Sequence, residues 1–332
     1  MKMNGHHPED AHETVIETQN LTKRYGDLVA VKGLNLKVKR GEIFGLLGPN
    51  GAGKTTTILM LLGLTEPTGG SARVLGHDPT REVLEVKGLV GYMPEDVGYY
   101  EDLTGRENLM YTADLNGLPR QEAAARVERL LSQVGLAEVA DKRVEHYSHG
   151  MRQRLGLADV LVKDPEIIIL DEPTQGIDPQ GAQDLLKFIV RLSRERQMTV
   201  LISSHLLDQM QRICDRVAIF VRGEVIAEGP IDTLGRQIMR GESLVVEVEV
   251  AARDGGTRSS REIVESLQDL PGVQKVEPSG GNHFLVHCSV DVRDRIATQL
   301  VEKGLSLTHL RLRGYGLTDI YMRYFRGGES DG

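Results

Sequence analysis

The chain has 332 residues, of which 40% are hydrophobic, 27% charged and 4% aromatic, with no tryptophan and a formal net charge of −8. This composition is that of a soluble globular protein with aliphatic cores, and the length suffices for two domains. The negative charge argues against broad binding to a nucleic-acid backbone. The two cysteines exclude a disulfide framework and suit a reducing compartment, and no apolar run approaches the roughly 18 residues that cross a bilayer.

The first part of the chain predicts strands that lead into a glycine-rich loop. Short β-like runs occupy 14–18, 34–39 and 42–47, with a turn at 25–28. The segment at 55–64 is apolar nearly all round, which predicts a buried helix. The preceding residues 1–13 have no apolar core, so we expect a disordered tail there and no signal peptide.

The middle of the chain changes from helical to alternating patterns. Residues 95–165 are mostly helical in pattern, and Gly135 is placed to end a helix that begins near 120. Two near-continuous apolar runs follow, at 166–170 and 199–204, with a helical segment at 180–196 between them. Apolar runs of this kind are typical of strands covered on both faces, so the β–α–β order predicts a parallel sheet. A hairpin with Gly223 in its turn is expected over 217–229.

The pattern changes again near residue 235. The remaining segments follow the order βαββαβ and end in a short helical run at 317–325. This order matches the ferredoxin-like plan, and about 95 residues can form their own core. We therefore expect an α/β domain over 14–234, whose helical subdomain spans about 95–165, and a small α+β accessory domain over 235–332.

The sequence GPNGAGKT at 48–55 fits the pattern G-x-x-x-x-G-K-[ST]. It follows a predicted strand and opens a predicted helix, which is the context that a phosphate-binding loop requires. Glycines let backbone amides turn toward phosphate oxygens, and the helix N-terminus adds its positive end. Lys54 is placed to reach the β- and γ-phosphates of a nucleotide, and the Thr55 hydroxyl to bind Mg²⁺.

Two adjacent carboxylates end the apolar strand in IIILDEP, at 167–173. Alone, they would be an ordinary acidic strand end. Behind a phosphate loop, Asp171 is placed to hold the Mg²⁺ shell, and Glu172 is placed beside the γ-phosphate, where it can polarise the attacking water.

A third motif is the turn in YSHGMRQRLGLA, at 147–158, where Ser148 and Gly150 precede an amphipathic helix. By itself this is a helix cap, with Ser148 as the capping residue.

Taken together, these motifs resemble the nucleotide-binding subunit of an ATP-binding cassette (ABC) transporter, over about residues 14–230. The resemblance implies a P-loop NTPase fold and adds four features. Tyr25 stands where the family stacks a ring on adenine, YMPED at 92–96 is the loop that senses Mg²⁺ through Glu95, GIDP at 176–179 follows the acidic strand, and His205 is the switch histidine that contacts the γ-phosphate. The nucleotide-binding positions that the family pattern implies are Tyr25, Gly48, Pro49, Asn50, Gly51, Ala52, Gly53, Lys54, Thr55, Thr56, Ser148 and Gly150.

The resemblance also gives the turn at 147–151 a second role. In this family two cassettes pack head to tail, so that the phosphate loop of one faces the signature turn of the other across ATP. Ser148 and Gly150 would then bind the γ-phosphate of the partner's nucleotide. The commonest form of the signature has Gly where this chain has His149 and Gln where it has Met151.

The sequence thus predicts an ATPase subunit that uses ATP and Mg²⁺, has Glu172 and His205 as catalytic residues, and has Thr55, Glu95 and Asp171 as metal ligands. The expected partners are separately encoded integral membrane subunits and a second copy or a related cassette, with no nucleic acid, at the inner face of the cell membrane. The YMPED loop, the YSxGM form and the extra domain resemble exporters. A soluble ATPase acting on ribosomes or DNA is one alternative, against which a single phosphate loop and the absence of a long coiled coil argue. An ATP-gated binding module is the other, against which the presence of Glu172 and His205 argues.

Overall fold

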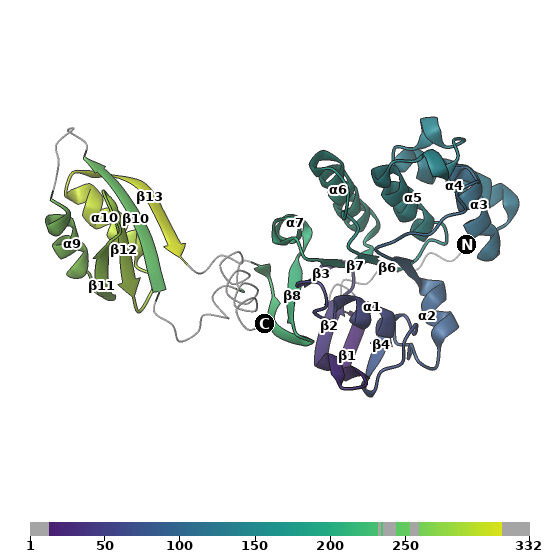
Figure 1. Ribbon diagram of the computed structural model, residues 1–332, viewed down its shortest axis with the longest axis horizontal. Coiled ribbons are helices and arrows are strands. Elements are labelled where there is room, and N and C mark those ends of the chain that lie inside the picture. Colours follow the sequence, from purple (N-terminus) through teal and green to yellow (C-terminus); the bar gives the residue numbers. More distant parts are fainter. Residues whose placement is uncertain (1–12, 232–233, 235–243, 253–258, 314–332) are drawn as a thin grey trace. The chain divides into compact units, whose positions relative to one another are not determined.

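A computed structural model describes residues 13–231, 234, 244–252 and 259–313 (Figure 1). Residues 1–12 of the expected tail and the short helix expected at 317–325 lie outside this described part. The contacts divide the chain into unit 1, Met1–Ile231, and unit 2, Asp232–Gly332. Each unit is described by itself.

The centre of unit 1 is a six-stranded sheet in the order β5-β6-β7-β3-β8-β9. Its first five strands run parallel, and β9 pairs antiparallel with β8. Their bounds are β3 Ile43–Leu47, β5 Val90–Met93, β6 Ile167–Asp171, β7 Thr199–Ser204, β8 Arg216–Val221 and β9 Glu224–Gly229. The prediction of a parallel sheet is confirmed, and every residue of β3, β6 and β7 is buried, as expected for strands covered on both faces.

A second, antiparallel sheet has the order β2-β1-β4. It consists of β1 Thr14–Tyr25, β2 Leu28–Lys39 and β4 Gly69–Val74. Along the second half of β2 buried and exposed residues alternate, so one face meets solvent, as the sequence predicts. Both β1 and β2 are longer than expected, because pairing with each other continues through polar residues.

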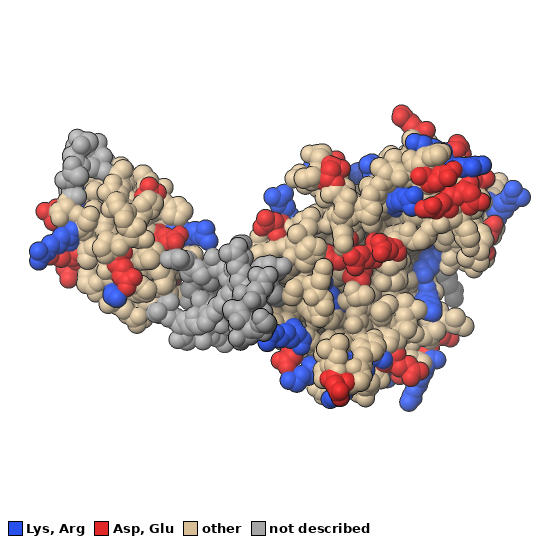
Figure 2. All heavy atoms as spheres, viewed as in Figure 1, with Lys and Arg blue, Asp and Glu red and all other residues tan. Residues whose placement is uncertain are grey.

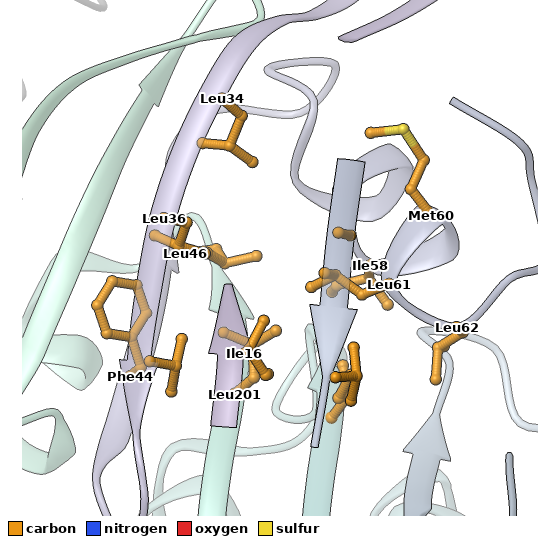
Figure 3. Packing of buried hydrophobic residues seen from close by; sticks show 14 of the residues in the cluster. Ile16, Leu34, Leu36, Phe44, Leu46, Ile58, Met60, Leu61, Leu62 and Leu201 are labelled. Carbon is orange, nitrogen blue, oxygen red and sulfur yellow. The ribbon is translucent and has the colours of Figure 1, made fainter. Parts of the chain in front are cut away.

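The main core of unit 1 lies between the two sheets and contains helix α1, Lys54–Leu61 (Figure 3). Ile16 and Leu36 come from the antiparallel sheet, Phe44 and Leu201 from the parallel sheet, and Ile58 from α1, and each is at most 1% exposed. Burying a side chain of this size contributes roughly 1.5–3 kcal/mol, so the helix that follows the glycine-rich loop is fixed firmly against both sheets.

The remaining helices lie outside the core between the two sheets, and several of them form a group of their own beside the parallel sheet (Figure 1). They are α2 Val83–Leu89, α3 Gly105–Leu115, α4 Arg120–Gln133, α5 His149–Leu161, α6 Pro179–Arg196 and α7 Leu207–Ile213, with short 3₁₀ turns at Ala137–Val139 and Val144–His146. Thr104 and Glu107 form a capping box at the start of α3, and Ser148 caps α5. Such caps satisfy amides that have no partner inside the helix.

Unit 2 is a four-stranded antiparallel sheet in the order β11-β12-β10-β13 with two helices. Its elements are β10 Leu244–Ala252, α9 Ser260–Gln268, β11 Val273–Pro278, β12 His283–Cys288, α10 Arg293–Glu302 and β13 Leu305–Arg313. Val246, Phe284 and Val286 pack with Ile263 and Ile296 in a core of its own.

Acidic and basic side chains are interspersed over the face of unit 1 that Figure 2 shows. Among the described residues, no helix is both long and apolar enough to cross a membrane.

Candidate functional site

A cavity of about 720 Å³ opens where the glycine-rich loop leaves β3. Five segments that are distant in sequence form it: the end of β1 with the start of β2, the loop with the start of α1, the residues just after β5, the residue just after β6, and the turn between β8 and β9. Its lining comprises Tyr25, Leu28, Val29, Ala30, Pro49, Asn50, Gly51, Ala52, Gly53, Lys54, Thr55, Thr56, Glu95, Glu172 and Arg222. The carboxyl ends of parallel strands are the usual place for a ligand in this kind of sheet.

The loop is held in shape by its own glycines and by neighbouring backbone. Gly53 has φ 104°, and a Cβ atom there would lie 2.5 Å from the carbonyl oxygen of Ala30. The Gly48 amide donates to the carbonyl of Ser204, and the amide of Gly223 donates to the carbonyl of Ala52. Only glycine fits at position 53 on both counts, so the backbone approaches the β1–β2 turn closely and α1 begins directly at Lys54.

Lys54 is 5% exposed, and its ammonium lies inside the loop. Its Nζ donates to the carbonyls of Gly48 at 2.6 Å and Pro49 at 3.1 Å, and lies 3.2 Å from Glu172 Oε1. Glu172 Oε1 has this ion pair but no hydrogen bond of good geometry. A buried carboxylate oxygen with an incomplete shell is suited to a polar ligand such as a water molecule.

The backbone of Glu172 is in the left-handed region, with φ 47°. This conformation is uncommon for a residue with a Cβ and costs of order 1–3 kcal/mol. The amide of Glu172 donates to both the carbonyl and the hydroxyl of Ser203, at 3.2 and 3.1 Å. These bonds hold the strand end in a conformation that turns the Glu172 carboxylate toward Lys54.

His205 and Asp171 complete this part of the site. His205 Nδ1 lies 3.0 Å from Glu172 Oε2, and the Ser203 hydroxyl donates to Asp171 Oδ1. Strand β6 lies directly beside β7, as the sequence predicts, and the register of the two strands pairs Asp171 with Ser203. Asp171 is 1% exposed and is not among the residues that line the cavity.

Glu95 lies at the cavity, half-buried, just after β5. The pKa of the neighbouring Tyr92 phenol is raised to about 12, first by burial and then by the negative charges of Asp171 and Glu95. Both carboxylates therefore act on the same phenol, which places negative potential at this edge of the site.

Tyr25 ends β1 at the cavity and is 49% exposed. The Lys23 ammonium lies 4.9 Å from the centroid of its ring. An exposed ring of this kind has a face available for stacking on a base.

Ser148 and Gly150 are not part of the cavity lining. Ser148 is exposed, and its Oγ accepts from the Met151 amide at 3.3 Å, which is the capping bond expected from the sequence. A Cβ built on Gly150 would lie 3.5 Å from Ile177 Cγ2, an ordinary van der Waals contact, so the exposed part of this turn is Ser148 and His149. Within one chain, the structure therefore brings together the phosphate loop, Glu95, Glu172 and His205, and leaves the signature turn apart from the cavity.

The sequence reasoning missed several residues of the site. Ser203 forms hydrogen bonds with both Asp171 and Glu172. Val29 and Ala30 line the cavity from the start of β2, and Arg222 lines it from the turn between β8 and β9. None belongs to a motif, and only the pairing of strands brings them there. The sequence offered one indication of these residues: the strand patterns within 14–39 predict a turn near Tyr25, and this turn brings the start of the next strand close to Tyr25.

Comparisons with known proteins agree with this geometry. The family model described as ABC transporter matches residues 31–175. The bacitracin transport ATP-binding protein BcrA of Bacillus licheniformis is 34% identical over 315 residues, which are 95% of this chain and 98% of that protein. The linearmycin resistance ATP-binding protein LnrL of Bacillus subtilis (strain 168) is 33% identical over 317 residues, 92% of this chain and 100% of that protein.

Solved structures show the same fold for part of the chain. An ATP-binding subunit of an ABC transporter is 32% identical, with a TM-score of 0.62, over 69% of this chain and 95% of that one. A dimeric bacterial ABC transporter cassette is 26% identical, with a TM-score of 0.59, over 65% of this chain and 98% of that one.

Proposed function

The chain belongs to the ABC transporter family of ATP-binding proteins, and from this premise we propose that it is the ATP-hydrolysing subunit of an exporter. It works as a head-to-tail pair with a second copy or a related cassette. It is bound at the inner face of the cell membrane to separately encoded membrane subunits. Binding of ATP closes the pair, and hydrolysis and release open it again.

One observation carries the proposal: the Glu172 carboxylate is held between Lys54 and His205 at the mouth of the phosphate loop. Oxygen atoms of a triphosphate would compete with Glu172 for the Lys54 ammonium. Glu172 would then accept a hydrogen bond from the attacking water and hold its proton as the bond to the γ-phosphate forms. His205 orients the Glu172 carboxylate through Nδ1.

The residues suited to Mg²⁺ are Thr55, Asp171 and Glu95. Magnesium is usually bound by one or two carboxylates together with substrate phosphates and water, and the oxygen donors at this edge of the cavity fit that chemistry. When bound, Mg²⁺ neutralises charge on the β- and γ-phosphates. The described residues contain no group of three or more His, Cys, Asp or Glu side chains placed to hold a metal ion by themselves.

The signature turn serves the partner's nucleotide. Ser148 and Gly150 stand at the N-terminus of the 13-residue helix α5, whose amides and dipole favour an anion. They lie outside their own chain's cavity, and a dimeric cassette is among the similar structures. Tyr25 is proposed to stack on the adenine.

The names of the relatives favour export over the alternatives. The two relatives that match nearly the whole chain carry names that refer to bacitracin transport and to linearmycin resistance. A Nod factor export ATP-binding protein of Burkholderia orbicola is 43% identical over 214 residues. None of these names describes an ATPase of ribosomes or DNA.

The proposed function is tested by phosphate release from the purified chain. We expect saturable release with MgATP and loss of release when EDTA removes the metal, because the phosphate charge is then no longer neutralised. The transport part is tested by co-purification with the membrane proteins encoded beside its gene. Absence of hydrolysis, with ATP binding retained and these membrane proteins present, would contradict the proposal.

A separate prediction concerns Glu95, where most of the family has Gln. A carboxylate keeps the metal-binding oxygen and adds negative charge near the triphosphate, so Glu95 should tie ATP binding to Mg²⁺. We expect Glu95→Gln to improve ATP affinity in EDTA by roughly three- to fivefold and to change MgATP affinity less. Isothermal titration of both forms is the measurement, with Asp96→Asn, an exposed neighbour, as the control. Equal changes with and without Mg²⁺ would place Glu95 away from the metal.

A further inference from the structure

His149 occupies the position in the signature turn where the commonest form of the family has glycine. It is the first residue of α5, and its Nε2 lies 2.6 Å from the carbonyl oxygen of Gln175. A carbonyl only accepts, so Nε2 must carry the hydrogen in this contact. Gln153 Nε2 lies 3.5 Å from the same ring nitrogen, and because both nitrogens are then donors this second contact is not a hydrogen bond.

The His149 ring packs against Gly176, in the loop after β6, where the absence of a side chain leaves room for the imidazole. Gly176 has φ +70°, and a Cβ built there would lie 2.9 Å from His149 Nε2 and 3.0 Å from Cδ2. A side chain at 176 would displace the imidazole. The signature turn therefore contacts the loop after β6 in two ways: through the hydrogen bond from His149 to Gln175, and through packing of the His149 ring against Gly176.

This loop begins at the proposed catalytic base. The Gln175 amide donates to the carbonyl of Glu172 at 3.0 Å, in a tight turn. Gln175 therefore accepts a hydrogen bond from His149 through its carbonyl and donates one to the Glu172 carbonyl through its amide. These two bonds connect the signature turn to the backbone of Glu172.

A second branch leads from the same helix to Glu95. Gln153, one turn along α5 and 2% exposed, donates through Nε2 to the Glu95 carbonyl at 3.4 Å. His149 and Gln153, four residues apart on α5, thus contact the Gln175 carbonyl in the turn after Glu172 and the Glu95 carbonyl.

We propose that His149 is a positioning residue that fixes the signature turn to the turn after Glu172. The inference rests on the proposed function. Ser148 and Gly150 serve the partner's nucleotide, whereas Glu172 serves the nucleotide of its own chain. The His149–Gln175 bond therefore links the two composite sites of the pair within one polypeptide, and it makes hydrolysis at one site responsive to occupancy of the other.

Two substitutions separate the hydrogen bond from the shape of the ring. His149→Phe keeps a ring against Gly176 and removes the donor, whereas His149→Gln restores a donor at the reach of Nε2. We expect His149→Phe to lower kcat roughly three- to tenfold, as for the loss of one neutral hydrogen bond, and to bring the Hill coefficient for ATP toward 1. His149→Gln should retain both values, and KM should stay within about twofold in each variant, because the bond does not touch the chain's own nucleotide. His146→Phe, on an exposed neighbouring histidine, is the matched control.

The outcomes distinguish this role from others. Equal kinetics in Phe, Gln and parent chains would overturn it, and so would a change in KM alone, which would indicate direct contact with nucleotide. Nitrogen-15 NMR of histidine-labelled parent chain gives a readout without hydrolysis, and the signal is assigned by its loss in His149→Gln. An Nε2–H tautomer at His149 supports the contact, whereas an Nδ1–H tautomer removes the donor and overturns the inference. If the parent hydrolyses no ATP, the proposed function fails while the NMR result still decides the contact.

Discussion

Glu172→Gln should lower phosphate release from MgATP by at least about a hundredfold, the scale of losing a general base. The amide has the shape of the carboxylate and keeps an oxygen for Lys54 Nζ, which lies 3.2 Å from Glu172 Oε1. It cannot take the proton of the attacking water. ATP affinity should be retained or improved, because one negative charge near the γ-phosphate is removed. Phosphate release and isothermal titration are the two measurements.

The same variant should accumulate as a closed dimer with MgATP, because ATP still brings the two chains together but is not hydrolysed, and hydrolysis is the step that opens the dimer. Light scattering at saturating MgATP would detect the dimer. Glu166→Gln, at an exposed residue directly before the same strand, is the matched control and should remain active. If the Glu172→Gln chain stays monomeric, isolated chains do not form the closed pair. If it hydrolyses ATP at the normal rate, Glu172 is not the general base.

The second large effect is recovery of activity by mixing two inactive chains. Lys54→Ala loses the buried ammonium of the phosphate loop, and Ser148→Arg places a bulky side chain at the start of α5. Each variant alone forms pairs with no undamaged composite site. A mixed pair retains one, made from Lys54 of the Ser148→Arg chain and Ser148 of the Lys54→Ala chain.

Mixing should therefore restore part of the ATPase activity, measured as phosphate release against each variant alone. The geometry motivates the test, because Lys54 lines the cavity and Ser148 does not. Differently tagged chains allow mixed pairs to be isolated. If isolated mixed pairs have no activity, the sites are not shared between chains.

The parts of the fold that the sequence predicts best are those whose burial is uniform. The runs at 166–170 and 199–204 are almost continuously apolar, and the corresponding strands β6 and β7 are buried at every residue. Strand β4 was not predicted, because GGSARV contains two glycines and only two of its residues, Ala72 and Val74, are buried. It is a strand because β1 pairs with it, and pairing partners cannot be read from a six-residue segment.

The candidate site divides in the same way. The phosphate loop and the pair Asp171–Glu172 are contiguous motifs, so their residues can be found along the sequence. Ser203 lies two positions before His205, whose role in the site was predicted. Its hydrogen bonds to Asp171 and Glu172, however, depend on the register of β6 and β7. The bond from His149 to Gln175 depends on how α5 meets a loop 26 residues away, which no local pattern encodes.

The left-handed backbone at Glu172 has a consequence for engineering this protein. At φ 47° glycine or asparagine relieves strain that a glutamate side chain imposes. A redesign that ranks substitutions by folding stability alone would thus be drawn to replace the proposed base. Thermostable variants should accordingly be selected with position 172 held fixed, since stability and turnover oppose each other at this one residue.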